Sequence, residues 1–219
     1  MSAASRAVLH LAHPSPPAHL KSEFPSRDYP AGATVYRSHG HGLGPRWFSH
    51  SGAGRFDLAA PQGTCYVAES EVVTLLETWG GMQVVPSYLA ADRDSSHLHL
   101  RHGVTVADLT SNLAIQYGVT SEIFTTTDYG LTQLWASSFR QAGFSGIRYW
   151  ARHDLAHTAA CLALFGPGDP SKSLAGFEVE GTDHLPDCRD LLDQLERETG
   201  ITVLAVSYTH LTLPTTPYV

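Results

Sequence analysis

Residues 64–79 read TCYVAESEVVTLLETW, and this stretch joins a strand pattern directly to a helix pattern. The run Thr64–Ala68 is rich in β-forming residues and has the length of a buried strand. The residues that follow place apolar side chains on one helix face: Val72, Leu75, Leu76 and Trp79. Ser70 stands at the position of a helix N-cap, and Gly80-Gly81 follows as a stop. The stretch therefore predicts a buried strand followed by an amphipathic helix over 71–79.

Strand patterns recur on both sides of this unit. They cover residues 34–38, 46–48, 98–101, 104–107, 147–150, 161–165, 175–179 and 201–206. Further helices are predicted over 128–142 and 186–198. The residues of the first that should face inward are Leu131, Leu134, Trp135 and Phe139. Because the strands cluster between a few helices without regular β-α alternation, we expect an α+β fold in which mixed β-sheets are flanked by helices.

The chain of 219 residues fits a single compact domain better than two domains. Residues 1–29 contain four prolines and are expected to form an extended Pro-rich arm, not a helix. Residues 30–206 are expected to form the domain itself. Residues 207–219 carry no Lys, Arg, Asp or Glu and resemble a translated sequencing adapter, so we interpret them as a non-native tail. The alternative is a natural disordered tail.

The composition argues against several kinds of partner. Fourteen Lys and Arg stand against 21 Asp and Glu, and the resulting net charge of -7 disfavours a surface for nucleic acid or anionic lipid. No apolar run approaches the roughly 20 residues that a membrane-spanning helix needs, and the N-terminus lacks the pattern of a secretory signal. The three cysteines show no C-x-x-C spacing. We therefore expect a cytoplasmic protein with neither nucleic acid nor membrane as a partner.

Common catalytic and metal-binding motifs are missing from the sequence. It contains no G-x-S-x-G elbow, no Walker loop and no G-x-G-x-x-G followed by a helix. Its 13 histidines include no H-E-x-x-H, and His39-Gly40-His41 has no cysteine or carboxylate near it along the chain. We interpret the histidines as structural or incidental and expect no bound metal.

A smaller, ordered set of residues could carry chemistry: Arg37, Arg55, Tyr66 and Glu77. Each also has a structural explanation, because the arginines could be surface cations, Tyr66 a half-buried strand residue and Glu77 a solvent-facing helix residue. Glu77, however, lies beside the apolar face of the predicted helix. Its carboxylate should therefore meet the edge of the core, where it needs a partner.

The order and spacing of these residues resemble the RES domain family, which takes its name from an Arg, a Glu and a Ser. The segments that carry the resemblance are Tyr36-Arg37, Gly54-Arg55-Phe56, Tyr66-Val67-Ala68-Glu69-Ser70, Glu77 eleven residues after Tyr66, Gly146-Ile147-Arg148-Tyr149 and Ala163-Leu164-Phe165-Gly166. The resemblance covers about residues 30–206. It implies a single domain related in fold to the ADP-ribosyltransferases.

The same resemblance implies an enzyme that consumes NAD and serves as the toxin of a toxin-antitoxin pair, with an Xre-type antitoxin as its partner. The reaction would be phosphorolysis or hydrolysis of the nicotinamide-ribose bond, with inorganic phosphate as the co-substrate in the first case, or transfer of ADP-ribose to a protein. Arg37 and Glu77 become the catalytic candidates, with Glu77 stabilising positive charge on the ribose. Arg37 or Arg55 would hold the diphosphate or an incoming phosphate, and Tyr66 would contact the nicotinamide ring or a ribose hydroxyl.

The serine of the family has no clear counterpart in this chain. It is expected shortly before the helix that precedes Gly146, where the sequence reads Thr125-Thr126-Thr127-Asp128-Tyr129. Thr127 is the candidate hydroxyl for binding phosphate or ribose. Asp128 is either a site residue or a helix N-cap. The unmatched serine also keeps open a reading from another class, a catalytically inactive module that binds NAD.

Overall fold

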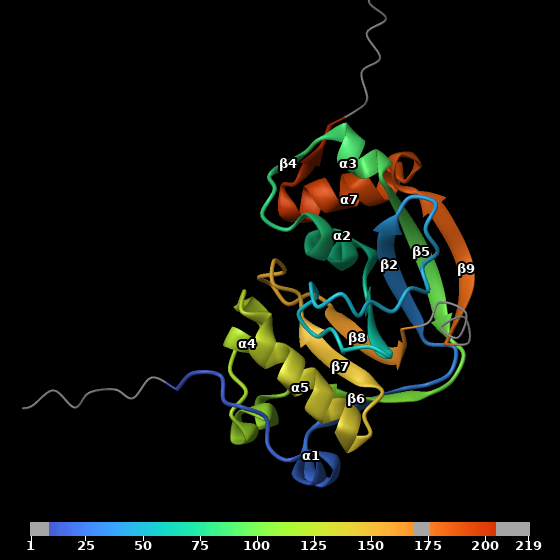
Figure 1. The fold of residues 1–219 in the computed structure, drawn as a ribbon. Helices are drawn as coiled ribbons and strands as arrows, with labels where there is room; N and C mark the ends of the chain where they lie inside the picture. The colour runs from blue at the N-terminus through green and yellow to red at the C-terminus, as the bar shows by residue number, and fades with distance from the viewer. Residues whose placement is uncertain (1–8, 169–175, 205–219) are drawn as a thin grey trace, which may run out of the picture.

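A mixed eight-stranded sheet forms the centre of the computed structural model, which describes residues 9–168 and 176–204 (Figure 1). Its strands are β1 (Ser26–Tyr29), β2 (Thr34–Gly40), β3 (Gln62–Ala68), β5 (Arg93–Leu100), β6 (Val104–Asp108), β7 (Gly146–Trp150), β8 (Ala160–Pro167) and β9 (Phe177–His184). They are ordered β1-β6-β7-β8-β3-β2-β5-β9. The β6-β7 pair is parallel and the other neighbouring pairs are antiparallel. Strands β3 and β8 are therefore the middle of the sheet.

Helices pack against this sheet in two groups (Figure 1). The α-helices are α1 (Pro17–Glu23), α2 (Glu71–Trp79), α3 (Ser87–Ala91), α4 (Glu122–Thr125), α5 (Tyr129–Ala142) and α7 (Arg189–Thr199), and the 3-10 helices are η1 (Asn112–Tyr117) and η2 (Leu185–Asp187). Helices α1 and α5 pack together beside β6 and β7, whereas α2, α3 and α7 gather at the other end with a small parallel pair, β4 (Val84–Val85) and β10 (Thr202–Val203). The expectation of an α+β fold with a mixed sheet flanked by helices is confirmed.

The helix predicted over 71–79 is α2, with the predicted bounds. Its apolar face belongs to a buried cluster shared with α3 and α7, which includes Leu75, Trp79 and Leu195. Ser70 lies at the N-cap position with an extended backbone, but its side chain makes no capping hydrogen bond. The opposite, more polar face of α2 is thereby left turned toward the middle of the sheet.

Helix α5 confirms the second predicted helix, and its inward face differs at one residue. Trp135 and Phe139 are fully buried, whereas Leu134 is 49% exposed. The face of α5 that meets the core runs through Thr132, Trp135 and Phe139. Leu134 lies to one side of this face and is therefore exposed. At the C-terminal end, Gly143 has a φ of 97°, a left-handed conformation that stops the helix and is easily adopted by glycine.

The N-terminal segment is not the extended arm that its prolines predict. Residues 17–23 form helix α1, and residues 26–29 form strand β1, which pairs with β6 at the edge of the sheet. The helix is possible because Pro17 occupies its first turn, where the backbone N–H has no partner within the helix. Leu20 and Phe24 then bury their side chains in the core beside α5. Packing of this apolar pair outweighs the weak helix propensity of the segment.

Several smaller predictions are also corrected or fall outside the described residues. Residues 46–48 form no strand, since only a single bridge from Ser49 to Thr64 joins this segment to β3. The segment before Thr127 contains two short helices, η1 and α4, that no periodicity indicated. The helix predicted over 186–198 begins later, at Arg189. The proposed tail, 207–219, lies outside the described residues, and no described helix is long and apolar enough to cross a membrane.

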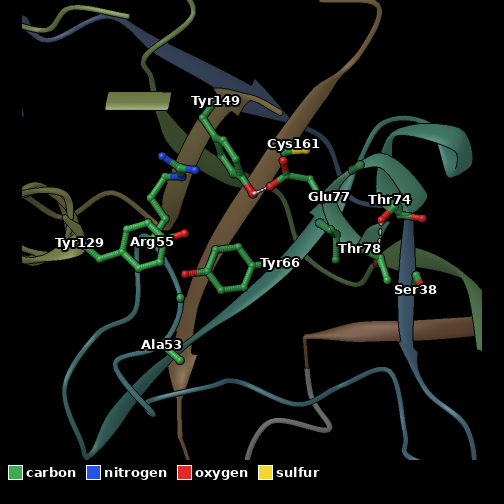
Figure 2. A pocket seen from close by; sticks show the side chains of 13 residues that line it. Ser38, Ala53, Arg55, Tyr66, Thr74, Glu77, Thr78, Tyr129, Tyr149 and Cys161 are labelled. Atoms are coloured by element: carbon green, nitrogen blue, oxygen red, sulfur yellow. Dashed lines mark hydrogen bonds between the residues drawn. The ribbon is translucent and has the colours of Figure 1, made fainter. Parts of the chain in front are cut away.

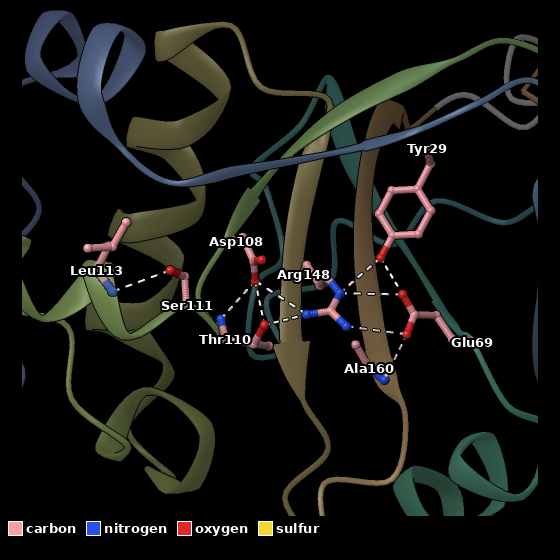
Figure 3. Close-up of polar contacts among 8 residues, drawn as sticks. All are labelled: Tyr29, Glu69, Asp108, Thr110, Ser111, Leu113, Arg148 and Ala160. Atoms are coloured by element: carbon pink, nitrogen blue, oxygen red, sulfur yellow. Dashed lines mark hydrogen bonds and ion pairs between the residues drawn. The ribbon is translucent and has the colours of Figure 1, made fainter.

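A partly buried polar network joins Tyr29 on β1, Glu69 just after β3 and Arg148 on β7 (Figure 3). Arg148 donates from Nε to Glu69 Oε1 at 3.3 Å and from Nη2 to Oε2 at 3.4 Å, and the hydroxyl of Tyr29 also donates to Glu69. The backbone N–H of Ala160 donates to the same carboxylate at 3.2 Å. Burial opposes ionisation of Glu69, but these hydrogen bonds and the charge of Arg148 hold its pKa below the usual value.

The lowered pKa of Glu69 predicts a pH-dependent contribution to stability. Because the carboxylate is favoured in the folded state, its stabilisation is fully present above the unfolded pKa of about 4.3 and is lost as pH falls through the lower folded pKa. Glu69→Gln should therefore destabilise the protein at pH 7 and progressively less as the pH falls below about 4. Urea unfolding between pH 3 and pH 7 measures the difference. Glu178→Gln, at an exposed position on β9, is the control, and a pH-independent difference for Glu69→Gln would contradict the prediction.

Candidate active site

A cavity of about 280 Å³ lies over the middle of the sheet, between the polar face of α2 and the start of α5 (Figure 2). It is lined by Ser38, Ala53, Gly54, Arg55, Tyr66, Val67, Ala68, Thr74, Glu77, Thr78, Tyr129, Tyr149 and Cys161. These residues come from β2, β3, α2, α5, β7, β8 and the loop before β3. Segments far apart in the sequence thus provide one arginine, one glutamate, two tyrosine phenols from the sheet and several hydroxyls at a single site.

Glu77 points from α2 into this cavity, and two donors hold its carboxylate (Figure 2). Its Oε1 accepts the backbone N–H of Arg152 at 2.9 Å, and its Oε2 accepts the hydroxyl of Tyr149 at 3.4 Å. Burial raises the pKa of Tyr149 well above its usual value, so this phenol keeps its proton and acts as a donor. The partner that the sequence required for Glu77 is therefore supplied by β7 and the turn that follows it.

Arg55 enters the same cavity from the loop before β3, and only 8% of the residue is exposed. Its Nη1 donates to the carbonyl oxygens of Ile123 at 3.3 Å and Thr126 at 3.1 Å. The guanidinium also lies 5.3 Å from the ring centroid of Tyr129. Among the described residues, Nε and Nη2 have no hydrogen-bond partner. One side of a fixed, charged fork is thus left to bind an anion.

Tyr66 forms a wall of the cavity from β3, in the middle of the sheet. Its hydroxyl accepts the backbone N–H of Phe56 at 2.9 Å and donates to Asp57 Oδ1 at 2.9 Å. Burial and the neighbouring charge of Asp57 raise the pKa of Tyr66, so it remains a neutral phenol. A side chain at Gly54 would collide with this pair, since a Cβ there would lie 2.5 Å from the Tyr66 oxygen. The loop that presents Arg55 therefore needs glycine at position 54.

Ser38 lines the cavity, and its hydroxyl is buried without a hydrogen-bond partner among the described residues. An unpaired buried hydroxyl is costly, and such groups are candidates for contact with a bound molecule. It lies on β2, on the strand face that turns toward α2. Ser38 thus adds a free donor and acceptor to the site.

Two residues proposed from the sequence lie outside this cavity. Arg37 precedes Ser38 on β2, and because side chains alternate across a strand it points to the opposite face. There its Nη1 donates to the carbonyl oxygens of Pro45 at 2.6 Å and Trp47 at 2.8 Å, which fixes the loop after β2. The geometry therefore gives Arg37 a structural position and does not support the expectation that it is catalytic.

Thr127 is exposed and does not line the cavity, so the expectation that it binds the substrate is not supported either. Its neighbour Thr126 contributes through the backbone, as a carbonyl that holds Arg55. Asp128 is the N-cap of α5, because its Oδ1 accepts the N–H of Gly130 at 3.1 Å. Tyr129 and Tyr149 also line the cavity, although the sequence did not predict this for either residue. Tyr149 was within a matching segment, but nothing local to it indicated contact with Glu77.

The mixed sheet flanked by helices has the α+β architecture of the ADP-ribosyltransferase-like fold. Within that class, the chain belongs to the RES domain family, whose model matches residues 34–183. A chain of the crystal structure of the M. tuberculosis MbcT-MbcA toxin-antitoxin complex has a similar fold, with a TM-score of 0.55 and 13% identity, over 71% of this chain and 85% of that chain. A comparison with curated protein sequences found no significant match.

Proposed function

We propose that this protein cleaves the nicotinamide-ribose bond of NAD and acts as the toxin of a toxin-antitoxin pair. The observation that carries the proposal is the meeting of Arg55, Tyr66 and Glu77 in one cavity of a chain that belongs to the RES domain family. The similar fold in a toxin-antitoxin complex supports the biological role. NAD is the substrate in this proposal.

Glu77 is the proposed catalytic group. When the bond from ribose C1′ to the nicotinamide nitrogen breaks, its electron pair leaves with the nicotinamide, which becomes neutral, and C1′ acquires oxocarbenium character. A carboxylate held beside C1′ stabilises this developing positive charge. The hydrogen bonds from the Arg152 N–H and Tyr149 would keep the Glu77 carboxylate in place throughout. A carboxylate that is held in this way is already oriented toward C1′, so its surroundings need not reorganise during the reaction.

Arg55 is the proposed phosphate ligand. Its Nε and Nη2, which have no hydrogen-bond partner in the described part of the chain, suit the phosphate next to the reacting ribose, or an incoming inorganic phosphate. Tyr66 would support the nicotinamide ring, and Ser38 would find a partner in a ribose hydroxyl. The volume of about 280 Å³ is just below the range of roughly 300–1,000 Å³ that is typical of small-molecule sites. We therefore expect the cavity to enclose the nicotinamide riboside half, with the adenosine half outside.

The acceptor that attacks C1′ decides the product. Inorganic phosphate would give a phosphorylated ADP-ribose, and water would give ADP-ribose and a proton. A nucleophilic protein side chain would make the chain a protein ADP-ribosyltransferase that uses the same cavity. If no acceptor reacts, the chain is the inactive NAD-binding module.

The experiment is incubation of the purified chain with NAD, with and without inorganic phosphate, followed by chromatography of the products. We expect release of nicotinamide, and the ribose product identifies phosphate or water as the acceptor. Modified protein detected by mass spectrometry in a lysate would favour transfer instead. NAD that binds but remains intact, with a folded protein, would overturn the proposed activity and favour the inactive module.

A toxin of this kind needs a neutralising partner, and we propose an Xre-type antitoxin that covers the mouth of the cavity. Expression of the chain alone should stop bacterial growth, and co-expression with the product of the adjacent gene should restore it. Normal growth in the presence of the active enzyme would contradict the toxin role, but it would not contradict the cleavage of NAD.

A further inference from the structure

Two histidines and one aspartate from different strands meet at one end of the sheet. They are His41, just after β2, Asp94 on β5 and His184 at the end of β9. Strands β2, β5 and β9 lie side by side along that edge (Figure 1). None of the three side chains lines the cavity described above. The cluster is therefore separate from that cavity.

The ligand atoms of the three side chains lie close together. His41 Nδ1 lies 2.7 Å from Asp94 Oδ1, and His184 Nδ1 lies 3.3 Å from the same oxygen. One ligand atom from each residue falls within 4.8 Å of the others. The two imidazole rings are close to each other, with centroids 4.1 Å apart. Two imidazoles thus contact a single carboxylate oxygen through their Nδ1 atoms. In this geometry one cation could take the place of the protons that otherwise lie between nitrogen and oxygen.

The spacing suits a small tetrahedral metal ion. With bonds of about 2.0–2.2 Å to nitrogen and oxygen, tetrahedral Zn²⁺ separates its ligand atoms by roughly 3.3–3.5 Å. The pair formed by His184 and Asp94 already has this separation. His41 would need to move outward slightly, and it can, because its side chain is 56% exposed and it stands between Gly40 and Gly42.

The backbone holds the aspartate in the position that a ligand requires. Asp94 is paired directly with His184 in the β5-β9 register, and its side chain is only 9% exposed. Its other oxygen, Oδ2, accepts the backbone N–H of Gly42 at 3.0 Å. This hydrogen bond turns Oδ1 toward the two imidazoles, which is the role of the outer partners that orient ligands at metal sites.

The charge around the cluster also favours a cation. The hollow beside His184 is lined by Asp183, Asp187 and Asp190, with Arg189 as its one lysine or arginine among the described lining residues. A site surrounded by carboxylates raises the local concentration of cations. The exposed side of His41 leaves room for a water molecule as the fourth ligand.

We propose that His41, Asp94 and His184 bind one Zn²⁺ ion, with a fourth position open to solvent. Two imidazoles and a carboxylate form a borderline nitrogen and oxygen donor set, which suits zinc better than magnesium or calcium. The bound ion would join the ends of three neighbouring strands, β2, β5 and β9. Such a link should stabilise the folded chain, because the three ligands are brought together only by folding.

Calorimetric titration of ZnCl₂ into the chelator-treated chain, without a histidine tag, tests the proposal. We expect one Zn²⁺ per chain and a higher Tm when zinc is present. Loss of a residue that only orients a ligand costs about 10- to 100-fold in metal affinity, so His41→Ala and His184→Ala should each weaken binding by about 100-fold or more. His102→Ala, at an exposed position away from the cluster, is the matched control and should bind as the wild type does.

His41 is well exposed, so its replacement should not prevent folding, and circular dichroism of each variant verifies this. The proposal is overturned if the wild-type chain binds no zinc. It is also overturned if the double variant His41→Ala/His184→Ala binds one equivalent with unchanged affinity, because the ion would then be held elsewhere. Neither result depends on the activity toward NAD.

Discussion

Glu77→Gln should slow the release of nicotinamide from NAD by at least about 100-fold while the protein remains folded. Glutamine has nearly the same shape and can still accept the backbone N–H of Arg152, which lies 2.9 Å from the glutamate oxygen. What disappears is the negative charge beside the ribose, and that charge acts mainly in the transition state. The loss should therefore appear in kcat more than in KM. Steady-state kinetics with NAD measures both.

Glu71→Gln is the matched control for this experiment. Glu71 belongs to the same helix, α2, but its carboxylate accepts a hydrogen bond from Ser95 on β5 and does not line the cavity. This variant should keep its activity, so a general effect of changing helix α2 can be distinguished from an effect on the site. A Glu77→Gln enzyme as fast as the wild type would remove Glu77 from the mechanism, even if NAD cleavage itself were established.

Arg55→Lys should lower kcat/KM for NAD by roughly 10- to 100-fold, the range expected for losing one charge-assisted hydrogen bond. Lysine keeps the positive charge but cannot bind the carbonyls of Ile123 and Thr126 and also present a planar fork to a phosphate. If the arginine contacts the phosphate in the ground state, KM should rise. Kinetics with NAD and thermal unfolding of the same sample distinguish weaker binding from reduced stability.

Arg140→Lys, at an exposed position in the last turn of α5, is the control for replacing arginine by lysine. It should change neither the kinetics nor the Tm. If Arg55→Lys lowered only the Tm and left kcat/KM unchanged, the guanidinium would serve to hold the loop to Ile123 and Thr126 and not to bind the substrate.

Some parts of the fold could be predicted because neighbouring residues in the sequence determine them. Helix α2 has an apolar face that repeats at helical spacing and is followed by glycines, so its bounds could be read directly. The position of Glu77 beside that face likewise indicated a carboxylate at the edge of the core. In contrast, α1 was missed because its formation depends on burying Leu20 and Phe24 against α5, a contact between distant segments.

The residues that line the cavity likewise include some that the sequence could predict and others that only the tertiary structure places there. Arg55, Tyr66 and Glu77 could be chosen from the order of motifs, and the fold does bring them together. The position of Arg37 could not be predicted without the strand, because only the alternation of side chains along β2 places it on the opposite face from Ser38. Tyr149 reaches Glu77 across 72 positions of the chain, a distance that no local pattern bridges.

By itself, the sequence determined the fold class, the main strands and helices, and three of the residues that line the cavity, since periodicity and motif order are properties of neighbouring residues. Only the tertiary structure decided which side chains share a site. His41 lies 53 residues from Asp94, and His184 lies 90 residues from it on the other side, yet three adjacent strands bring them within reach of one ion. The pairing of strands sets such distances, because it connects segments whose separation along the chain carries no information about their separation in space.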